Sequence, residues 1–147
     1  MNIIEANIKH LDDIAPLFNA YRIFYEQPSD LESAKQFLKD RITNCESIIY
    51  LAYDENEAVG FTQLYPLFSS VSMKPMYLLN DLYVKSNYRG NGIGEALINK
   101  AKALCEKEQN KGLALETAPD NPAQKLYKRL GFVKDHDLYY YWTRQSQ

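Results

Sequence analysis

The adjoining segments Leu79-Asn-Asp-Leu-Tyr-Val84 and Lys85-Ser-Asn-Tyr-Arg-Gly-Asn-Gly-Ile-Gly94 carry the strongest structural signal in this sequence. The first segment is apolar, β-branched and aromatic enough to predict a buried strand. The second alternates glycine with other residues and then runs into a helical pattern. Glycines there leave several backbone N–H groups uncovered at the start of a helix, because they accept backbone angles that a Cβ forbids. A hollow of this kind favours a bound phosphate.

Two familiar phosphate loops do not fit the spacing. A P-loop ends in Gly-Lys-Ser/Thr, and a dinucleotide-binding fold has Gly-x-Gly-x-x-Gly with an acid about 20 residues further on. Here Arg89 precedes Gly90, Gly92 and Gly94. The segment is therefore a phosphate loop of a third kind, or a glycine-rich connection that binds no ligand.

Hydrophobic periodicity predicts the element order β-α-α-β-β-β-α-β-α-β-β, which is one α/β domain over residues 1–147. The predicted strands cover residues 2–6, 47–53, 58–65, 76–84, 113–117, 132–134 and 138–143. The predicted helices begin near Asp12, at Ser29, at Ile93 and at Asn121. Pro16 suggests that the first helix begins late, because proline is tolerated only in the first helical turn.

Several boundaries have a chemical reason. Ser29-Asp-Leu-Glu32 is a capping-box pattern, and Asn121 before Pro122 predicts an N-cap for the last helix. Gly112 is expected to end the third helix and Gly131 the last one. Pro66 is expected to end the third strand.

The loop resembles the pyrophosphate loop of the GNAT superfamily of N-acetyltransferases, which is written Arg/Gln-x-x-Gly-x-Gly/Ala. The match falls on Arg89, Gly92 and Gly94. Asn121-Pro-Ala-Gln-Lys-Leu-Tyr-Lys-Arg-Leu-Gly-Phe132 is similar to the Asn-x-x-Ala-x-x-x-Tyr-x-x-x-Gly-Phe region of the same family, with the alanine displaced by one position. The predicted element order is also that of the family, so the resemblance covers most of the chain.

The resemblance implies a GNAT fold: a central, mixed but mostly antiparallel sheet, with splayed fourth and fifth strands, flanked by helices. It also implies acetyl-CoA as co-substrate, with the pyrophosphate on the glycine loop and the pantetheine arm paired along the fourth strand. The coenzyme-binding residues carried over in this way are Leu82, Tyr83, Val84, Arg89, Gly90, Asn91, Gly92, Ile93, Gly94, Asn121 and Tyr127. No metal is implied.

Transfer of an acyl group from a thioester to an amine benefits from a proton for the departing thiolate. Tyr127 falls on the family's tyrosine, so the resemblance makes it the general acid; its alternative role is packing between helix and sheet. A phenol with a pKa of about 10 suits a thiol leaving group of about 8.5. Asn121 either binds the pantetheine or caps a helix, and both roles are compatible.

The general base stays unassigned. Relatives that resemble diamine acetyltransferases carry Glu-Asp where this chain has Asn80-Asp81, and an asparagine cannot take a proton at neutral pH. Asp81 is expected to point to the other face of the strand unless a bulge turns it. Deprotonation of the amine through water remains open.

The acceptor is expected to meet the first two helices and the third strand. The candidate substrate-binding residues are Tyr21, Arg22, Tyr25, Tyr65 and Asn80. Arg22 could hold a carboxylate, or it could simply be solvated. A small amine or amino acid fits these residues better than a polycation, for which an acidic cluster is expected.

Composition narrows the partners. Seventeen basic and nineteen acidic residues give a net charge of −2, which argues against nucleic acid or an anionic membrane as a partner. Cys45 and Cys105 lack metal-ligand spacing, and the sequence shows neither a signal-peptide pattern nor a membrane-spanning run, so a cytoplasmic protein is expected. The aromatic run Leu138-Tyr-Tyr-Tyr-Trp142 is expected to pack one face in the core, with the other face a candidate homodimer interface.

Three functions follow from these expectations. The leading one is an N-acetyltransferase that moves acetyl from acetyl-CoA directly to the primary amine of a small molecule. The alternatives are a protein N-terminal or lysine acetyltransferase, and a catalytically silent acetyl-CoA-binding module.

Overall fold

The computed structural model describes residues 1–145. Its internal contacts divide the chain into two compact units, Met1–Glu116 and Thr117–Gln147. A single domain over residues 1–147 stays a prediction.

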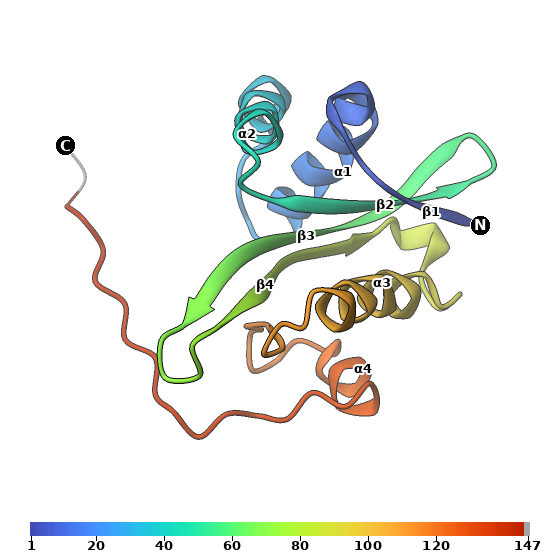
Figure 1. Ribbon diagram of the computed structural model, residues 1–147. Helices are drawn as coiled ribbons and strands as arrows, with labels where there is room; N and C mark the ends of the chain where they lie inside the picture. Colours follow the sequence, from blue (N-terminus) through green and yellow to red (C-terminus); the bar gives the residue numbers. More distant parts are fainter. Residues whose placement is uncertain (146–147) are drawn as a thin grey trace. The chain divides into compact units, whose positions relative to one another are not determined.

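The first unit is built on a mixed sheet, which within the described residues has five strands in the order β1-β2-β3-β4-β5 (Figure 1). Neighbouring strands from β1 to β4 are antiparallel, whereas β4 and β5 are parallel. The strands are β1 (Asn2–Glu5), β2 (Ile48–Asp54), β3 (Glu57–Ser69), β4 (Lys74–Val84) and β5 (Leu113–Ala114). The predicted mixed, mostly antiparallel sheet is therefore confirmed.

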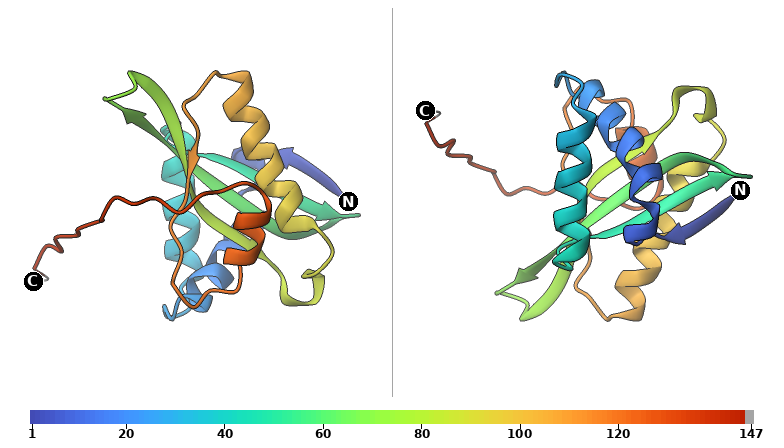
Figure 2. Two further views of the ribbon diagram at one scale, coloured as in Figure 1. Left: turned by 90° about the horizontal axis from the view of Figure 1, so that it is seen from below. Right: turned by 90° about the horizontal axis from the view of Figure 1, so that it is seen from above.

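Helices flank this sheet on both faces. In Figure 2, α1 and α2 cross one face and α3 crosses the other. The helices of this unit are η1 (Ile8–His10), α1 (Leu11–Phe24), α2 (Leu31–Thr43), η2 (Ser86–Tyr88) and α3 (Ile93–Lys107).

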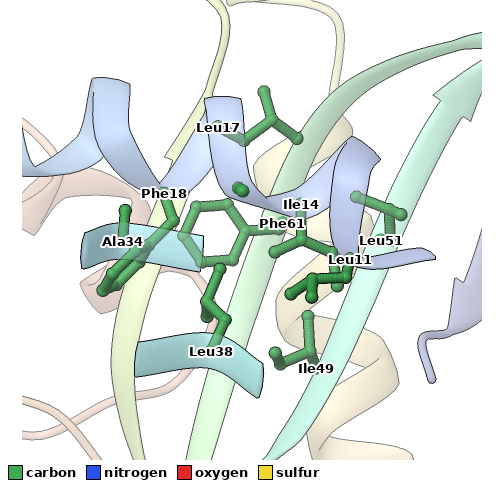
Figure 3. Packing of buried hydrophobic residues seen from close by; sticks show 10 residues of the cluster. Leu11, Ile14, Leu17, Phe18, Ala34, Leu38, Ile49, Leu51 and Phe61 are labelled. Carbon is green, nitrogen blue, oxygen red and sulfur yellow. The ribbon is translucent and has the colours of Figure 1, made fainter. Parts of the chain in front are cut away.

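A hydrophobic core fills the space between the sheet and the helices α1 and α2 (Figure 3). Ile14, Leu38 and Phe61 are fully shielded from solvent and come from α1, α2 and β3 respectively. Burial of one such side chain contributes about 1.5–3 kcal/mol, so this apolar face stabilises the pairing of the two helices with β3.

The late start predicted for the first helix is wrong. α1 begins at Leu11 and contains Pro16 as an interior residue. Pro16 is exposed while Ile14, Ala15 and Leu17 beside it are buried. The carbonyl that proline leaves unbonded thus lies on the solvent side, and burial of the opposite face offsets the lost hydrogen bond.

The cap of α2 is Asp30, not Ser29. The Asp30 carboxylate accepts a hydrogen bond from the backbone N–H of Ser33 at 3.1 Å, and Ser29 Oγ instead accepts from Asn19 Nδ2 at 3.0 Å. Hydrogen bonds from the side chain and backbone of Ser33 lower the pKa of Asp30 below its ordinary value. A charged cap suits the positive end of the helix dipole, which explains the shift by one residue.

The hairpin of β3 and β4 is longer than predicted, because β3 continues past Pro66 to Ser69. β2 pairs with β3 only as far as Leu64, so Pro66 lies where β4 is the one strand among the described residues that pairs with β3. Proline is tolerated at such an edge because no second strand needs its missing N–H. The tip of the hairpin exposes three apolar side chains, Phe68, Val71 and Met73.

The end of α3 and the strand after it also differ from prediction. α3 ends at Lys107, and Gln109 (φ 55°) turns the chain before Gly112 is reached. β5 keeps only Leu113 and Ala114 of the predicted strand over residues 113–117. Parallel pairing therefore stops at Leu78 of β4.

The second unit contains α4 (Gln124–Arg129). Asn121 was expected to cap it directly, but the helix begins later, and Asn121 Oδ1 accepts from the backbone N–H of Ala123 at 2.9 Å in the turn before it. Gly131 (φ 92°) follows the helix end as predicted. The N–H groups of Gly131 and Phe132 close the last turn on the carbonyls of Lys128 and Tyr127.

The two predicted closing strands, residues 132–134 and 138–143, are wrong, since neither segment is a strand. Leu138 and the aromatic run Tyr139–Trp142 are all exposed, by 72% or more, so neither face of the run is in a core. An alternating pattern defines faces only when a neighbouring strand pairs with the segment, and no described residue does so. A homodimer interface at this run stays a prediction.

Among residues 1–145, no helix has both the length and the apolarity needed to cross a membrane. The same residues contain no group of three or more His, Cys, Asp or Glu side chains that could hold a metal ion.

Candidate active site

The glycine loop joins the end of β4 to α3, as predicted. Gly90 (φ 81°) and Gly92 (φ 80°) both have left-handed backbone angles, and Gly92 is the N-cap of α3. A Cβ added to either glycine would meet no atom within 4 Å, so the backbone angle and not crowding is what requires glycine.

The loop has the features that an anion needs. Gly92 has no side chain with which to cap α3, and the backbone N–H groups of the first turn lie at the positive end of the helix dipole. Ile93 and Gly94 begin this turn, and the Ile93 side chain is buried, which leaves only its backbone for a ligand. Asn91 Nδ2 donates to the carbonyl of Tyr88 at 3.1 Å and fixes the loop from within. These residues fit a pyrophosphate.

Arg89 is held against neighbouring elements. Its Nε donates to the carbonyl of Val84 at 2.8 Å. Its guanidinium carbon lies 5.5 Å from the ring centroid of Tyr83 and 5.8 Å from that of Phe24, within the range of cation–π attraction. The loop arginine therefore connects the end of β4 to the last residue of α1.

The free part of β4 begins where its pairing with β5 stops. Within the described residues, no strand pairs with β4 beyond Leu78 on the side away from β3. Leu82, Tyr83 and Val84 lie in this part, and alternate backbone groups of an antiparallel strand point away from its partner. An extended ligand arm could pair with them as an added strand would.

A cavity of about 410 Å³ lies on the face of the sheet that α1 and α2 cover, between the sheet and these two helices. Four of the five predicted substrate residues line it: Tyr21, Arg22, Tyr65 and Asn80. The fifth, Tyr25, is not among the lining residues, and its ring packs against Tyr21 at 5.0 Å between centroids. A second hollow of about 470 Å³ involves only residues of α2 and is a groove between side chains on its surface.

The cavity also contains residues that the sequence reading missed. Phe18 of α1 and Phe37 of α2 stack at 5.6 Å with nearly parallel rings and form an aromatic wall. Asp30 brings a carboxyl group, and Asp81, which the sequence placed here only if a bulge turned it, brings a second one. The helical spacing of Phe18 was a signal for burial, but nothing in the sequence distinguished a core position from a cavity wall.

Hydrogen bonds fix the polar residues around the cavity. Tyr21 Oη donates to the carbonyl of Asn80 at 3.0 Å, which ties α1 to β4. Arg22 Nη1 lies 3.5 Å from the carbonyl of Pro28, and its charge helps to lower the pKa of Asp30. Arg22 is thus half-buried and beside an acid, in contrast to the freely solvated side chain considered as one alternative.

Asp81 faces this cavity because of a β-bulge. Gln63 pairs with Asp81 and Leu64 pairs with Leu79, so Asn80 is an extra residue without a partner on β3. Phe61 packs with Phe18 on the helix α1 side, and Gln63, two positions further along β3, shares that face. Asp81 stands opposite Gln63 and therefore lies on the same face. The condition attached to the sequence prediction, a bulge that turns Asp81, is met.

Asp81 is a buried residue, with 1% of its surface exposed. Its Oδ2 accepts from Gln63 Nε2 and its Oδ1 accepts from Asn80 Nδ2, both at 2.7 Å. Burial raises the pKa of Asp81 from 3.8 to about 6, and the two hydrogen bonds limit the rise. Burial, with the Asp81 charge nearby, also raises the pKa of Tyr65 well above its ordinary range, so Tyr65 stays protonated at neutral pH.

Tyr127 and Asn121 belong to the second unit. The Tyr127 ring packs edge-on against Phe132 with 6.0 Å between centroids, and Tyr127 is half-buried. The roles predicted for both residues toward the coenzyme stay predictions.

Residues 11–132 match the family described as "Acetyltransferase (GNAT) family". The chain is 46% identical over 142 residues to the uncharacterized N-acetyltransferase YhfO of Bacillus subtilis, covering 96% of this chain and 95% of that protein. The crystal structure of a probable acetyltransferase superposes with a TM-score of 0.92 at 39% identity, over 100% of this chain and 99% of that one.

A more distant structure has a coenzyme bound. The aminoglycoside N-acetyltransferase AAC(6')-Iy in complex with CoA superposes with a TM-score of 0.80, covering 98% of this chain and 95% of that one. Its identity of 20% makes it a likeness of fold alone.

Proposed function

Because the chain belongs to the GNAT family of acetyltransferases, we propose that it transfers the acetyl group of acetyl-CoA directly to the primary amine of a small molecule, an amine or an amino acid. The activity class follows from membership, since GNAT enzymes are acyltransferases that use acetyl-CoA. The choice of a small acceptor is the proposal.

The cavity between β4 and the helices α1 and α2 carries the proposal. Its volume of about 410 Å³ falls in the range of small-molecule sites, about 300–1,000 Å³. An aromatic wall and a few polar groups line it, which is the usual composition of such a site. A polycation would need several exposed acids, and this cavity offers only Asp30 and Asp81.

The glycine loop supports the coenzyme half of the proposal. Gly90 to Gly94 would hold the pyrophosphate, with Arg89 beside them, and the free edge of β4 would hold the pantetheine arm. Acetyl-CoA supplies the acetyl group as an activated thioester. Tyr127 would give the departing sulfur its proton, and Asn121 would help to orient the arm.

Thiol release measured over a panel of primary amines tests the proposal. The panel contains arylalkyl amines, amino acids, polyamines, an aminoglycoside, and peptides with a free N-terminus or a lysine. We expect the highest kcat/KM with a monoamine or an amino acid. Preference for the peptides would favour the protein acetyltransferase, and coenzyme binding without turnover of any amine would favour the silent module.

A further inference from the structure

We propose that Asp81 is the general base of this enzyme and accepts the proton of the acceptor ammonium within the cavity. This inference rests on the proposed function, because it requires an amine in that cavity. Asn80 stands where relatives that resemble diamine acetyltransferases carry a glutamate, and the role is assigned here to the residue after it.

The bulge makes the assignment geometrically sound. If the register of Leu64 with Leu79 continued without interruption, Asn80 would stand opposite Gln63, and Asp81 opposite Thr62 on the other face. The extra residue reverses that outcome. Of the pair Asn80 and Asp81, only Asp81 can take a proton, and the bulge directs Asp81 toward the cavity. Asn80 supports it with a hydrogen bond of 2.7 Å.

The surroundings of Asp81 suit a base that works near neutral pH. A carboxylate in water is too weak a base to compete for the proton of an alkylammonium, and burial strengthens it by disfavouring the charge. Burial raises the pKa of Asp81 to about 6, so the group is mostly ionised at pH 7 and still able to accept a proton.

Gln63 can serve both protonation states of Asp81. Its Nε2 donates to the ionised carboxylate at 2.7 Å, while its buried Oε1 has no partner among the described residues. A half-turn of the amide would present Oε1 to a protonated Asp81, because the two ends of a glutamine amide have nearly the same shape. Gln63 is therefore a positioning residue that keeps Asp81 in place before and after the proton moves.

The proton and electron balance is simple. Asp81 takes one proton from the ammonium and leaves a neutral amine with a free electron pair. That pair forms the C–N bond to the acetyl carbon, the C–S bond breaks, the nitrogen loses its second proton, and the sulfur takes one proton. Asp81 then releases its proton to solvent, so the net products are the amide, CoA thiol and one proton.

Other ionisable groups surround Asp81, and none is a better base. Those that line the cavity or lie on the same face of the sheet are Tyr21 and Arg22 of α1, Asp30 at the start of α2, Tyr65 of β3 and Tyr83 of β4. Arg41 of α2 acts on Tyr65. Phenol and guanidinium groups are in general poor proton acceptors near neutral pH, and Asp30 is committed to capping α2 and has a lowered pKa.

The test is the pH dependence of acceptor kcat/KM in the unmodified enzyme and in Asp81→Asn, between pH 5 and 9. The unmodified enzyme should gain activity up to about pH 6 and then reach a plateau. In the variant, activity at pH 7 should fall by about 10²–10⁴-fold, and it should then rise about tenfold per pH unit as free amine forms. A fluorinated analogue whose amine is already uncharged at pH 7 should restore much of the variant's rate.

Glu108→Gln is the matched control. The Glu108 carboxylate also accepts a hydrogen bond from a residue of β4, Tyr77, at 2.6 Å, but Glu108 does not line the cavity. Its pH profile should be unchanged. If Asp81→Asn does not fold, Gln63→Met decides, because loss of the Nε2 donor should move the acidic limb upward by about half to one pH unit.

The outcomes separate the two proposals. An unmodified enzyme that acetylates no amine overturns the proposed function. An active enzyme whose profile is the same in Asp81→Asn, or whose acidic limb stays in place in Gln63→Met, overturns the role of Asp81 alone.

Discussion

The glycine loop and the cavity both adjoin β4 and are built in different ways. The loop depends on backbone: left-handed angles at Gly90 and Gly92, and the N–H groups at the start of α3. The cavity depends on side chains from α1, α2, β3 and β4, and on one extra residue in a strand. The loop is thus local and can be recognised in a short motif, whereas the cavity exists only after the chain has folded.

The first prediction separates the chemical step from the binding of coenzyme and acceptor. Tyr127→Phe removes one hydroxyl and little volume, so coenzyme affinity and acceptor KM should be kept. If Tyr127 protonates the thiolate, kcat and kcat/KM should both fall by about 10²–10⁴-fold in steady-state assays.

Tyr139→Phe, at an exposed tyrosine of the same unit, is the control and should have full activity. Full kcat in Tyr127→Phe would make Tyr127 a packing residue.

The second prediction is that a group in the cavity makes the free energy of unfolding depend on pH, whereas the loop does not. Because the pKa of Asp81 is higher in the folded state, about 6, than the ordinary 3.8, the folded protein binds this proton more tightly. The stabilisation is therefore complete below pH 4 and is lost as the pH rises to 6, by at most about 3 kcal/mol.

Urea unfolding at several pH values checks this prediction. The loss between pH 4 and 6 should be smaller in Asp81→Asn than in the unmodified protein. The same slope in both proteins would mean that the Asp81 carboxyl is not buried in solution.

The third prediction breaks the loop without touching the cavity. Gly92→Val places a β-branched residue at φ 80°, a backbone angle that such residues rarely adopt. Acetyl-CoA binding, measured by calorimetry on folded protein, should weaken at least tenfold, or about 1.4 kcal/mol.

Gly112→Ala is the control, because Gly112 has no neighbour within 4 Å of an added Cβ and lies outside the loop. Its coenzyme affinity should not change. Unchanged affinity in Gly92→Val would remove the loop from the coenzyme site.

The smallest expected effect concerns the rim of the cavity. If the acceptor carries a carboxylate, Arg22→Ala should raise its KM by about three- to tenfold, because a half-exposed charge pair contributes little more than 1 kcal/mol. Coenzyme affinity should not change. Lys39→Ala removes a cation of α2 that does not line the cavity and should leave KM alone.

An analogue without the carboxylate sharpens the result. If Arg22 binds the carboxylate, its removal from the substrate should raise the KM of the unmodified enzyme more than the KM of Arg22→Ala. Equal use of both compounds by both proteins would count against the role.

The sequence was informative where structure is local. Gly90, Gly92 and Gly131 were expected at backbone turns, and each has a positive φ. The order of the first five strands was also predictable, because apolar runs and turn residues alternate along the chain. These features depend on a few neighbouring residues and leave a readable pattern.

The sequence was uninformative where tertiary context decides. Pro16 lies inside a helix because it is exposed, and Pro66 lies inside a strand because β2 has already ended. The aromatic run Tyr139–Trp142 alternates like a strand but pairs with no strand in the part of the chain that the structure describes. The bulge at Asn80 has no signature of its own, since it reflects where two strands fit best against each other.

The extra residue in β4 also has an evolutionary consequence. Loss of Asn80 would make β4 a regular strand without moving any later position, because Asp81 would still stand opposite Gln63. A length change at the tip between Ser69 and Lys74, where β3 and β4 turn, would leave the cavity intact. The extra residue can therefore be gained or lost without changing the face on which Asp81 lies, and substitution of Asp81 itself is the event by which descendants of this chain would lose the proposed base.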